Sequence, residues 1–191
     1  MEKIVIGQGA RPLICTPLVG PTKEKILGQL EQAVLKQPDV IEWRADFFEH
    51  IDDTRQVLDV AEALTEKAGP RPVIFTIRSM REGGHPISLT DGETVALNAA
   101  VCRKTAVDYV DCELANGPGD IQALRVAASE TGKRIIGSFH DFNMTPDRET
   151  LMSKFTAAER YGLDVAKVAV MPQSLADVLV LLSVTLEAKS L

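Results

Sequence analysis

Residues 165–170 read VAKVAV and form the last of six short apolar stretches in the chain. Runs of this length that are rich in β-branched residues predict buried strands, because such side chains pack well on a pleated surface. The five earlier stretches occupy residues 13–16, 40–44, 73–78, 109–113 and 134–139. Six strands are therefore predicted, and the last carries a lysine, Lys167, near its centre.

Helix-like spacing of apolar residues follows each predicted strand. The segments with this pattern are 23–36, 54–67, 91–105, 120–131, 146–161 and 175–189. Thr90 with Glu93 predicts a capping box, and Thr145 before Pro146 predicts an N-cap with proline at the first helical position. Strict alternation of strand and helix predicts a parallel sheet.

Two α/β architectures accept this alternation, an open doubly wound sheet and a closed βα barrel. The doubly wound sheet usually has a glycine-rich phosphate loop after its first strand, whereas residues 16–20 read TPLVG. Polar residues instead follow several different strands at their C-terminal ends, where barrels build their active sites. We therefore predict a TIM-type βα barrel, with residues 1–191 forming a single domain.

The predicted barrel has fewer units than a complete one. An eight-unit barrel typically has about 250 residues, and this sequence supplies six units in 191 residues. From the sequence we expect a barrel domain that is incomplete at its C-terminus. Such a sheet has an open edge, and unpaired strand edges favour aggregation or oligomerisation.

The composition restricts the class of partner. With 27 acidic and 21 basic residues the net charge is −6, whereas a nucleic-acid-binding surface normally has a basic stripe. No apolar run approaches the roughly 20 residues of a membrane-spanning helix, and the N-terminus has no signal-peptide core. We expect a cytoplasmic protein that binds a small molecule, with no nucleic-acid or membrane partner.

The cysteines and histidines argue against a metal site. Cys15, Cys102 and Cys112 are an odd number and have no C-x-x-C spacing. The three histidines lie far apart in the sequence. We therefore predict neither a disulfide framework nor a zinc cluster.

Lys167 interrupts an apolar run, so it is predicted to lie on a strand buried on both faces. A buried unpaired ammonium is costly, and desolvation favours the neutral amine, the form that adds to a ketone to make an imine. In the alternative interpretation Lys167 pairs with a carboxylate or extends into solvent.

His140 directly follows the fifth predicted strand, which places it at the same rim as Lys167, one strand away. An imidazole in that position can move protons beside the nucleophile. Taken alone, a histidine at a strand end is more often a hydrogen-bonding residue, and the neighbouring Lys167 favours the catalytic interpretation.

Further polar side chains lie near the ends of the second and third predicted strands. Glu42, Arg44 and Asp46 alternate with apolar neighbours, so period-two geometry sends them to one face. Arg78 ends the third strand, and Glu82 in the following loop can orient His140. The structural alternative for these side chains is an ion-pair network that closes the top of the barrel.

Two smaller features complete the predicted site. Gly83 and Gly84 follow Glu82 and permit a close approach of the backbone. Asp111 and Glu113 share a face of the fourth strand, where they either support acid–base chemistry or neutralise the nearby cations.

Four motifs resemble those of type I 3-dehydroquinate dehydratase: EWRAD at 42–46, FTIRS at 75–79 followed by EGG at 82–84, SFHDF at 138–142 and AKVAVMPQ at 166–173. They occur in the family's order, and the resemblance covers nearly the whole chain. It implies a TIM-type barrel that is a homodimer and belongs to the shikimate pathway. The implied reaction converts 3-dehydroquinate to 3-dehydroshikimate by loss of water, without a metal or organic cofactor.

The resemblance also implies a role for each matching residue. Lys167 forms a Schiff base with the substrate ketone, His140 transfers protons, and Glu82 holds the histidine. The residues implied to bind polar groups of the substrate are Glu42, Arg44 and Arg78.

The sequence departs from the family's pattern in two places. Pro17 stands where some members have a serine that touches substrate. The family's seventh and eighth units carry an arginine for the substrate carboxylate and a serine and glutamine on a closing loop, and they have no counterpart up to Leu191. Two alternatives therefore stay open: an inactive fragment or interaction unit, and a class I aldolase, which also carries a Schiff-base lysine on the sixth strand of a barrel.

Overall fold

The computed structural model describes residues 3–9 and 11–190. Within them, six parallel strands form one sheet: β1 (Cys15–Leu18), β2 (Val40–Arg44), β3 (Val73–Thr76), β4 (Tyr109–Glu113), β5 (Arg134–Asp141) and β6 (Val165–Val170). Helices alternate with the strands: α1 (Lys23–Leu35), α2 (Thr54–Ala68), α3 (Asp91–Lys104), α4 (Pro118–Thr131), α5 (Arg148–Arg160) and α6 (Leu175–Ala188).

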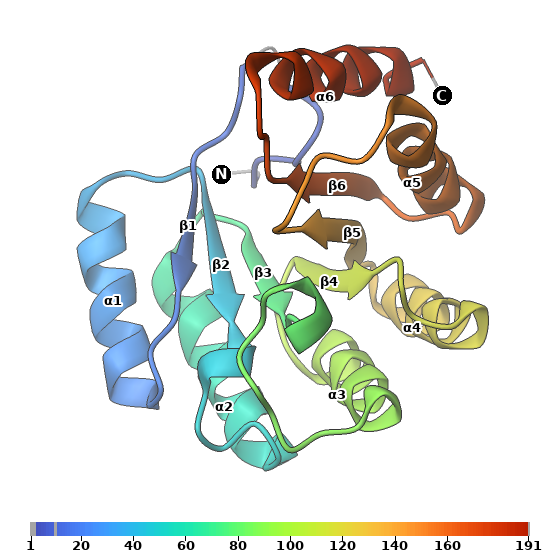
Figure 1. Cartoon of the computed structure of the whole chain (residues 1–191). Coiled ribbons are helices and arrows are strands. Elements are labelled where there is room, and N and C mark those ends of the chain that lie inside the picture. The colour runs from blue at the N-terminus through green and yellow to red at the C-terminus, as the bar shows by residue number, and fades with distance from the viewer. Residues whose placement is uncertain (1–2, 10, 191) are drawn as a thin grey trace.

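The order of strands in the sheet is the order in the chain, from β1 to β6. The sheet curls around a common centre and the helices lie on its outer face, as Figure 1 shows. In the described part of the chain, β1 and β6 each pair with a single strand. The prediction of a partial TIM-type barrel built from six βα units is confirmed.

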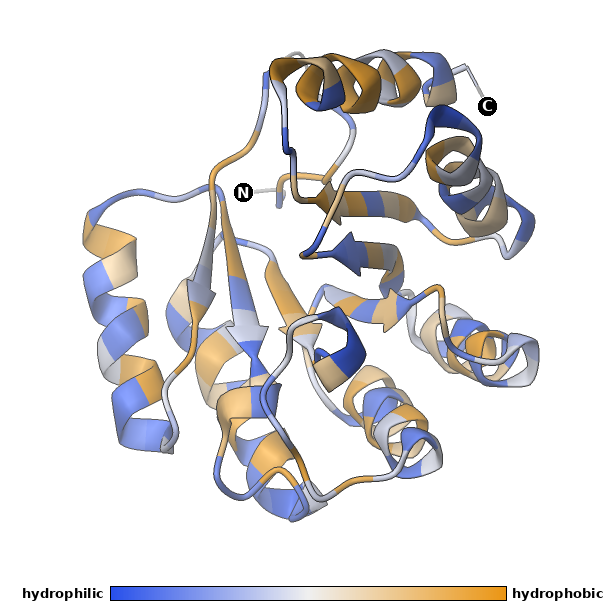
Figure 2. Ribbon diagram, viewed as in Figure 1, coloured by the Kyte–Doolittle hydropathy of each residue, from blue (hydrophilic) through white to orange (hydrophobic). Residues whose placement is uncertain are grey.

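Two apolar layers hold the sheet in place. The main core lies between the sheet and the helices, where Trp43, Phe75 and Ile135 are fully buried. Figure 2 shows hydrophobic colour on β3 and on parts of the other strands and helices, interrupted by hydrophilic segments such as β5. A smaller cluster fills the inside of the curled sheet near the N-terminal ends of its strands: Val40, Ile74, Tyr109 and Ile136.

The inner cluster determines which residues face the site. Side chains alternate along a strand, so the residue two positions further on points to the same face. Counting two positions from each member of the inner cluster gives four polar residues: Glu42, Thr76, Asp111 and Ser138. The inside of the sheet is therefore apolar at its N-terminal end and polar at its C-terminal end.

β6 is less buried than the sequence predicts. All five residues of β4 are buried, whereas none of the six residues of β6 is. The difference arises because β6 has only β5 beside it among the described residues. The prediction of a last strand buried on both faces is therefore wrong, and the Lys167 side chain keeps 36% of its surface exposed.

The predicted start of the fifth helix is also wrong. α5 begins at Arg148, and its N-cap is Asp147, whose carboxylate accepts a hydrogen bond of 2.8 Å from the backbone N–H of Thr150. Thr145 does not cap the helix because its hydroxyl donates to the backbone oxygen of Met171. A carboxylate two positions further along the chain thus competes successfully for the helix end.

Two other predicted boundaries have different outcomes. The capping box of Thr90 and Glu93 is confirmed, with both reciprocal hydrogen bonds present. The first strand covers residues 15–18 instead of 13–16 and includes Pro17. Proline lacks a backbone N–H, and it is tolerated there because β1 lies at an edge of the described sheet.

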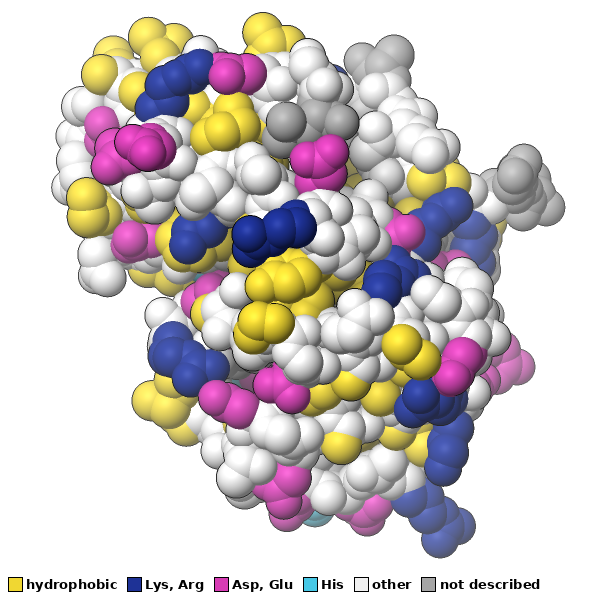
Figure 3. Space-filling model, turned by 90° about the vertical axis from the view of Figure 1, so that its right-hand side faces the viewer, with side chains coloured by type: hydrophobic (Ala, Val, Ile, Leu, Met, Phe, Trp, Pro, Cys, Tyr) yellow, Lys and Arg dark blue, Asp and Glu magenta, His cyan; other side chains and the backbone are white. Residues whose placement is uncertain are grey.

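The surface carries mixed charges. In Figure 3, which views the molecule from the side of α4 and α5, basic, acidic and hydrophobic side chains are interspersed. α6 presents four exposed leucines in a row along the helix, Leu175, Leu179, Leu182 and Leu186. Among the described residues, no helix is both long and apolar enough to cross a membrane.

Candidate active site

Lys167 points from β6 into the polar end of the curled sheet. Its Nζ lies 3.4 Å from Oε1 of Glu42 on β2 and 3.8 Å from Oδ2 of Asp111 on β4. The same oxygen of Glu42 accepts a hydrogen bond of 2.8 Å from Thr76 on β3. The amine is therefore directed inward, between two carboxylates that come from strands far away in the sequence.

His140 lies on β5, one strand from Lys167, and Glu82 holds it. Nδ1 of His140 is 2.9 Å from Oε2 of Glu82, and the backbone N–H of His140 donates to the same oxygen at 3.0 Å. The ring also stacks on Phe142, with 6.2 Å between the ring centroids. Because Nδ1 is engaged with a carboxylate, Nε2 is the nitrogen available for proton transfer.

The backbone near Glu82 passes very close to its neighbours. A Cβ added to Gly84 would lie 1.8 Å from the backbone oxygen of Arg78, and one added to Gly83 would lie 2.4 Å from the ring of Phe142. Gly83 also has a φ of 79°, which glycine adopts without strain. The predicted close approach is confirmed, and it places the 3₁₀ turn Met80–Glu82 beneath His140.

Arg78 lies at the centre of a cluster of carboxylates. Its guanidinium is 2.9 Å from Oδ1 of Asp111, 3.0 Å from Oε1 of Glu113 and 3.6 Å from Oε2 of Glu82. Burial acts to lower the pKa of Arg78, but the carboxylates of Asp111, Glu113 and Glu82 outweigh it and raise the pKa above its ordinary value. With its side chain only 3% exposed, Arg78 is primarily engaged with protein groups.

Arg44 and Asp46 form a second, separate pair. Nε and Nη2 of Arg44 donate to the two carboxylate oxygens of Asp46 at 2.8 and 2.7 Å. Asp46 also accepts from the backbone N–H groups of Arg78 and His85. The expectation that Asp46 continues the alternation of β2 is wrong, because the strand ends at Arg44 and a 3₁₀ turn follows.

Sequence reasoning missed Ser138. Its side chain is fully buried, its hydroxyl donates to Oδ1 of Asp111 at 2.6 Å, and it accepts from Nη1 of Arg78 at 2.9 Å. Ser138 lies two positions before His140 on the same strand and pairs in register with Lys167. The signal that could have found Ser138 is the period-two alternation of side chains along β5, which puts Ser138 on the same face as His140.

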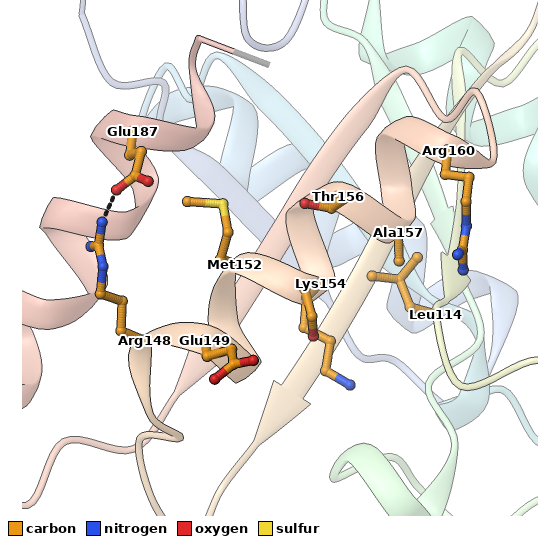
Figure 4. Close-up of a pocket in the computed structure, with 10 residues that line it drawn as sticks. Leu114, Arg148, Glu149, Met152, Lys154, Thr156, Ala157, Arg160 and Glu187 are labelled. Atoms are coloured by element: carbon orange, nitrogen blue, oxygen red, sulfur yellow. Dashed lines mark hydrogen bonds and ion pairs between the residues drawn. The ribbon is translucent and has the colours of Figure 1, made fainter.

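Of the predicted site residues, Lys167 and Glu42 line one cavity, whereas His140, Glu82, Arg44 and Arg78 are not among its lining residues. This cavity has a volume of about 700 Å³ and is also lined by Cys15 and by three members of the inner cluster, Val40, Ile74 and Ile136. Another cavity of about 750 Å³ lies apart from it, along α5 and toward α6 (Figure 4). It is lined by charged residues such as Arg148 and Glu187, which form an ion pair, and by none of the predicted site residues.

The chain is similar to proteins of known function along nearly its whole length. The model of the family "Type I 3-dehydroquinase" matches residues 14–191. A 3-dehydroquinate dehydratase from Geobacillus sp. (strain WCH70) is 48% identical over 182 residues, which are 95% of this chain and 70% of the relative.

Solved structures agree with this result. The 3-dehydroquinate dehydratase of Geobacillus kaustophilus HTA426 has a TM-score of 0.92 at 49% identity, over 95% of this chain and 70% of that one. A type I 3-dehydroquinate dehydratase from Clostridium difficile, described as containing covalently modified comenic acid, has a TM-score of 0.90 at 37% identity, over 95% and 71% of the two chains.

The alternative of an aldolase has weaker support. A putative deoxyribose-phosphate aldolase from Toxoplasma gondii has a TM-score of 0.64 at 11% identity, over 91% of this chain and 72% of that one. That likeness shows a shared fold alone. The family model and the high identities decide the matter: this chain belongs to the type I 3-dehydroquinase family.

Proposed function

We propose that the protein dehydrates 3-dehydroquinate to 3-dehydroshikimate in the shikimate pathway, with Lys167 as the Schiff-base nucleophile. The observation that carries this proposal is the placement of an inward-pointing lysine on β6 beside a carboxylate-held histidine on β5. The relatives' name, 3-dehydroquinate dehydratase, supports the choice of substrate.

The chemistry begins at the amine. Nζ of Lys167 attacks the ketone carbon of the substrate, and loss of the carbonyl oxygen as water leaves a protonated imine. This cation withdraws electrons from the neighbouring carbon and makes its C–H bond acidic. Nε2 of His140 removes that proton, and the electron pair moves into the C–C bond to give an enamine.

The second half of the reaction expels a hydroxyl group. The enamine pushes out the hydroxyl on the next carbon while the imidazolium of His140 returns the proton to it, so the leaving group is water. A water molecule then hydrolyses the imine and regenerates Lys167. The water lost on forming the imine is thus recovered on hydrolysis, and the net change is the loss of one water from the substrate.

The electrostatics of the site suit cationic intermediates. Three carboxylates, of Glu82, Asp111 and Glu113, surround Arg78, and the carboxylates of Glu42 and Asp111 lie beside Lys167. An excess of negative charge favours both the protonated imine and the imidazolium. Glu82 contributes most directly to the imidazolium because its oxygen contacts Nδ1.

The substrate-binding roles of Glu42, Arg44 and Arg78 stay proposals. Glu42 lines the cavity that Lys167 also lines, and the Arg44 side chain is 21% exposed. Arg78 is far more buried, and its main contribution is to hold the carboxylates in position. Homodimeric assembly and a cytoplasmic location also stay predictions, and light scattering of the purified protein tests the first.

The covalent part of the proposal has independent support from the family. The Clostridium difficile relative is described as containing covalently modified comenic acid, which is what a reactive side chain in this fold would produce. No organic cofactor enters the steps above, since the lysine itself supplies the electron sink once the imine has formed.

Trapping with borohydride tests the function. The purified protein is mixed with 3-dehydroquinate and sodium borohydride, and the modified lysine is located by peptide mass spectrometry. We expect a reduced adduct on Lys167, none in Lys167→Ala, and an unchanged adduct in Lys25→Ala, which alters an exposed lysine of α1.

Other outcomes would contradict the proposal in different ways. An adduct on a different lysine would remove Lys167 from the mechanism. An adduct formed with a phosphorylated aldose but not with 3-dehydroquinate would favour an aldolase. Absence of any adduct, together with no rise in the ultraviolet absorbance of the conjugated product, would mean that the chain is inactive.

A further inference from the structure

The two carboxylate oxygens of Asp111 differ in their hydrogen bonding among the described residues: Oδ1 has partners and Oδ2 has none. Oδ1 accepts from Ser138 Oγ at 2.6 Å and pairs with Nη2 of Arg78 at 2.9 Å. Oδ2 is buried and has no hydrogen-bond partner among the described residues. A buried carboxylate oxygen without a partner costs free energy. Such an atom in a cluster whose other oxygen is hydrogen-bonded is an acceptor that a bound group can use.

The free oxygen faces the proposed nucleophile. Oδ2 lies 3.8 Å from Nζ of Lys167, which is too far for a hydrogen bond and close enough for a strong charge interaction. The other carboxylate near the amine, that of Glu42, accepts two hydrogen bonds at Oε1, one of 2.8 Å from Thr76 and one of 3.4 Å from Nζ of Lys167. Of the oxygens of these two carboxylates, Oδ2 of Asp111 is the one that is buried without a hydrogen-bond partner among the described residues.

A structural role alone does not account for this arrangement. Arg78 also pairs with Glu113 at 3.0 Å and Glu82 at 3.6 Å, so its charge is compensated without Asp111. Arg78 and Ser138 both bind Oδ1, which fixes the carboxylate so that Oδ2 faces Lys167. The cluster therefore fixes the position of the Oδ2 atom of Asp111.

We propose that Asp111 is a catalytic residue whose Oδ2 serves as the counter-ion of Lys167 and accepts the single N–H of the protonated imine that replaces the ammonium. This inference rests on the proposed function. An ammonium has three N–H groups and can be shared by Glu42 and Asp111, whereas the protonated imine has one. The unfilled oxygen of Asp111 is the acceptor that the structure leaves available for it.

The Asp111 carboxylate has opposite effects on the reactivity of the unmodified Lys167 and on the amount of the protonated imine. A nearby carboxylate stabilises the resting ammonium and so slows reactions that require the neutral amine. The same carboxylate stabilises the protonated imine once it has formed. Loss of the charge should therefore make Lys167 more reactive toward simple reagents and at the same time reduce the amount of imine, which general damage to the fold would not do.

Asp111→Asn is the test variant, because the amide keeps the shape and can still accept from Ser138. Glu113→Gln is the matched control: it also removes a carboxylate from Arg78, but Glu113 has no contact with Lys167 in the described structure. Circular dichroism first establishes that both variants have the native fold. If Asp111→Asn fails this check, Asp111→Ser, which also removes the charge, takes its place, and Asp111→Glu, which retains the charge, should behave as the wild type.

The first measurement needs no substrate. An amine-acylating reagent is added at neutral pH, and the labelling rate of Lys167 relative to exposed Lys25 is followed by mass spectrometry. We expect about a tenfold increase in Asp111→Asn, the size of effect that a single charge at this distance can exert in a partly solvated site. Glu113→Gln should leave the ratio within about twofold of wild type.

The second measurement uses 3-dehydroquinate and borohydride. We expect Asp111→Asn to lower the trapped adduct and to reduce kcat by about 10- to 100-fold with KM changed far less, as for an interaction specific to the reacting state. An unchanged relative labelling rate in natively folded Asp111→Asn overturns the inference. If the wild type forms no adduct, the proposed function fails, while the labelling rates still decide whether Asp111 is the counter-ion of Lys167.

Discussion

A single oxygen of Glu82 holds both the ring and the backbone of His140: it lies 2.9 Å from Nδ1 and 3.0 Å from the backbone nitrogen. The side chains of both residues are less than 10% exposed. This contact orients the imidazole and leaves Nε2 for the reaction. The negative charge of Glu82 also stabilises the imidazolium of His140, so replacing this carboxylate should slow the reaction.

Glu82→Gln should reduce kcat by about 10- to 100-fold, with a much smaller change in KM, because an amide cannot stabilise the imidazolium as a carboxylate does. Steady-state kinetics with 3-dehydroquinate provide the measurement. The control is Glu66→Gln on the exposed face of α2, which should match wild type. Equal kcat values for Glu82→Gln and wild type would remove Glu82 from the catalytic arrangement.

Arg78→Met should destabilise the protein by about 3 to 5 kcal/mol, because it leaves buried carboxylates without their cation. The measurement is the free energy of unfolding from urea denaturation. Arg81→Met on the neighbouring turn removes an exposed pair with Asp91 and should cost at most about 1 kcal/mol. If the two variants were equally stable, Arg78 would not be the centre of the cluster.

Gly84→Ala should destabilise the protein by about 1 to 3 kcal/mol, since its Cβ would collide with the backbone oxygen of Arg78 and the chain must shift. The shift would also move Glu82 and lower kcat. Gly92→Ala in α3 has open space around the new Cβ and should leave stability unchanged or slightly higher. Thermal unfolding of the two variants side by side checks this difference.

Asp39 should contribute to stability in a pH-dependent way. Its hydrogen bond to Arg11, helped by one from the backbone of Ile14, lowers the pKa of Asp39 from 3.8 to about 2. Because this pKa is lower than in the unfolded chain, the stabilisation is complete above the unfolded value and is lost as the pH falls through the folded value.

The difference in Tm between wild type and Asp39→Asn should therefore be largest above about pH 5 and should shrink as the pH falls from about 4 to 2. Arg11→Met removes the main cause of the lowered pKa and should weaken the same pH dependence. A Tm difference that stays constant across this range would show that the Arg11–Asp39 pair has no such effect.

Local patterns predicted most of the framework correctly. Each β-branched run became a strand, and the capping box at Thr90 and Glu93 formed as predicted, because these features depend on neighbours a few residues away. The predicted helix start at Thr145 was wrong because the hydroxyl of Thr145 bonds to Met171 in the folded chain, and the carboxylate of Asp147 caps the helix instead.

By itself, the sequence determined the alternation of strands and helices, the face of each strand, and the presence of a lysine and a histidine at adjacent strand ends. Only the tertiary structure decided that Ser138 and Asp111 hold Arg78 and that Lys167 keeps partial contact with solvent. Periodicity acts within one strand, whereas these contacts join residues 27 to 125 positions apart. Their distances depend on the register and curl of the whole sheet, which no local pattern specifies.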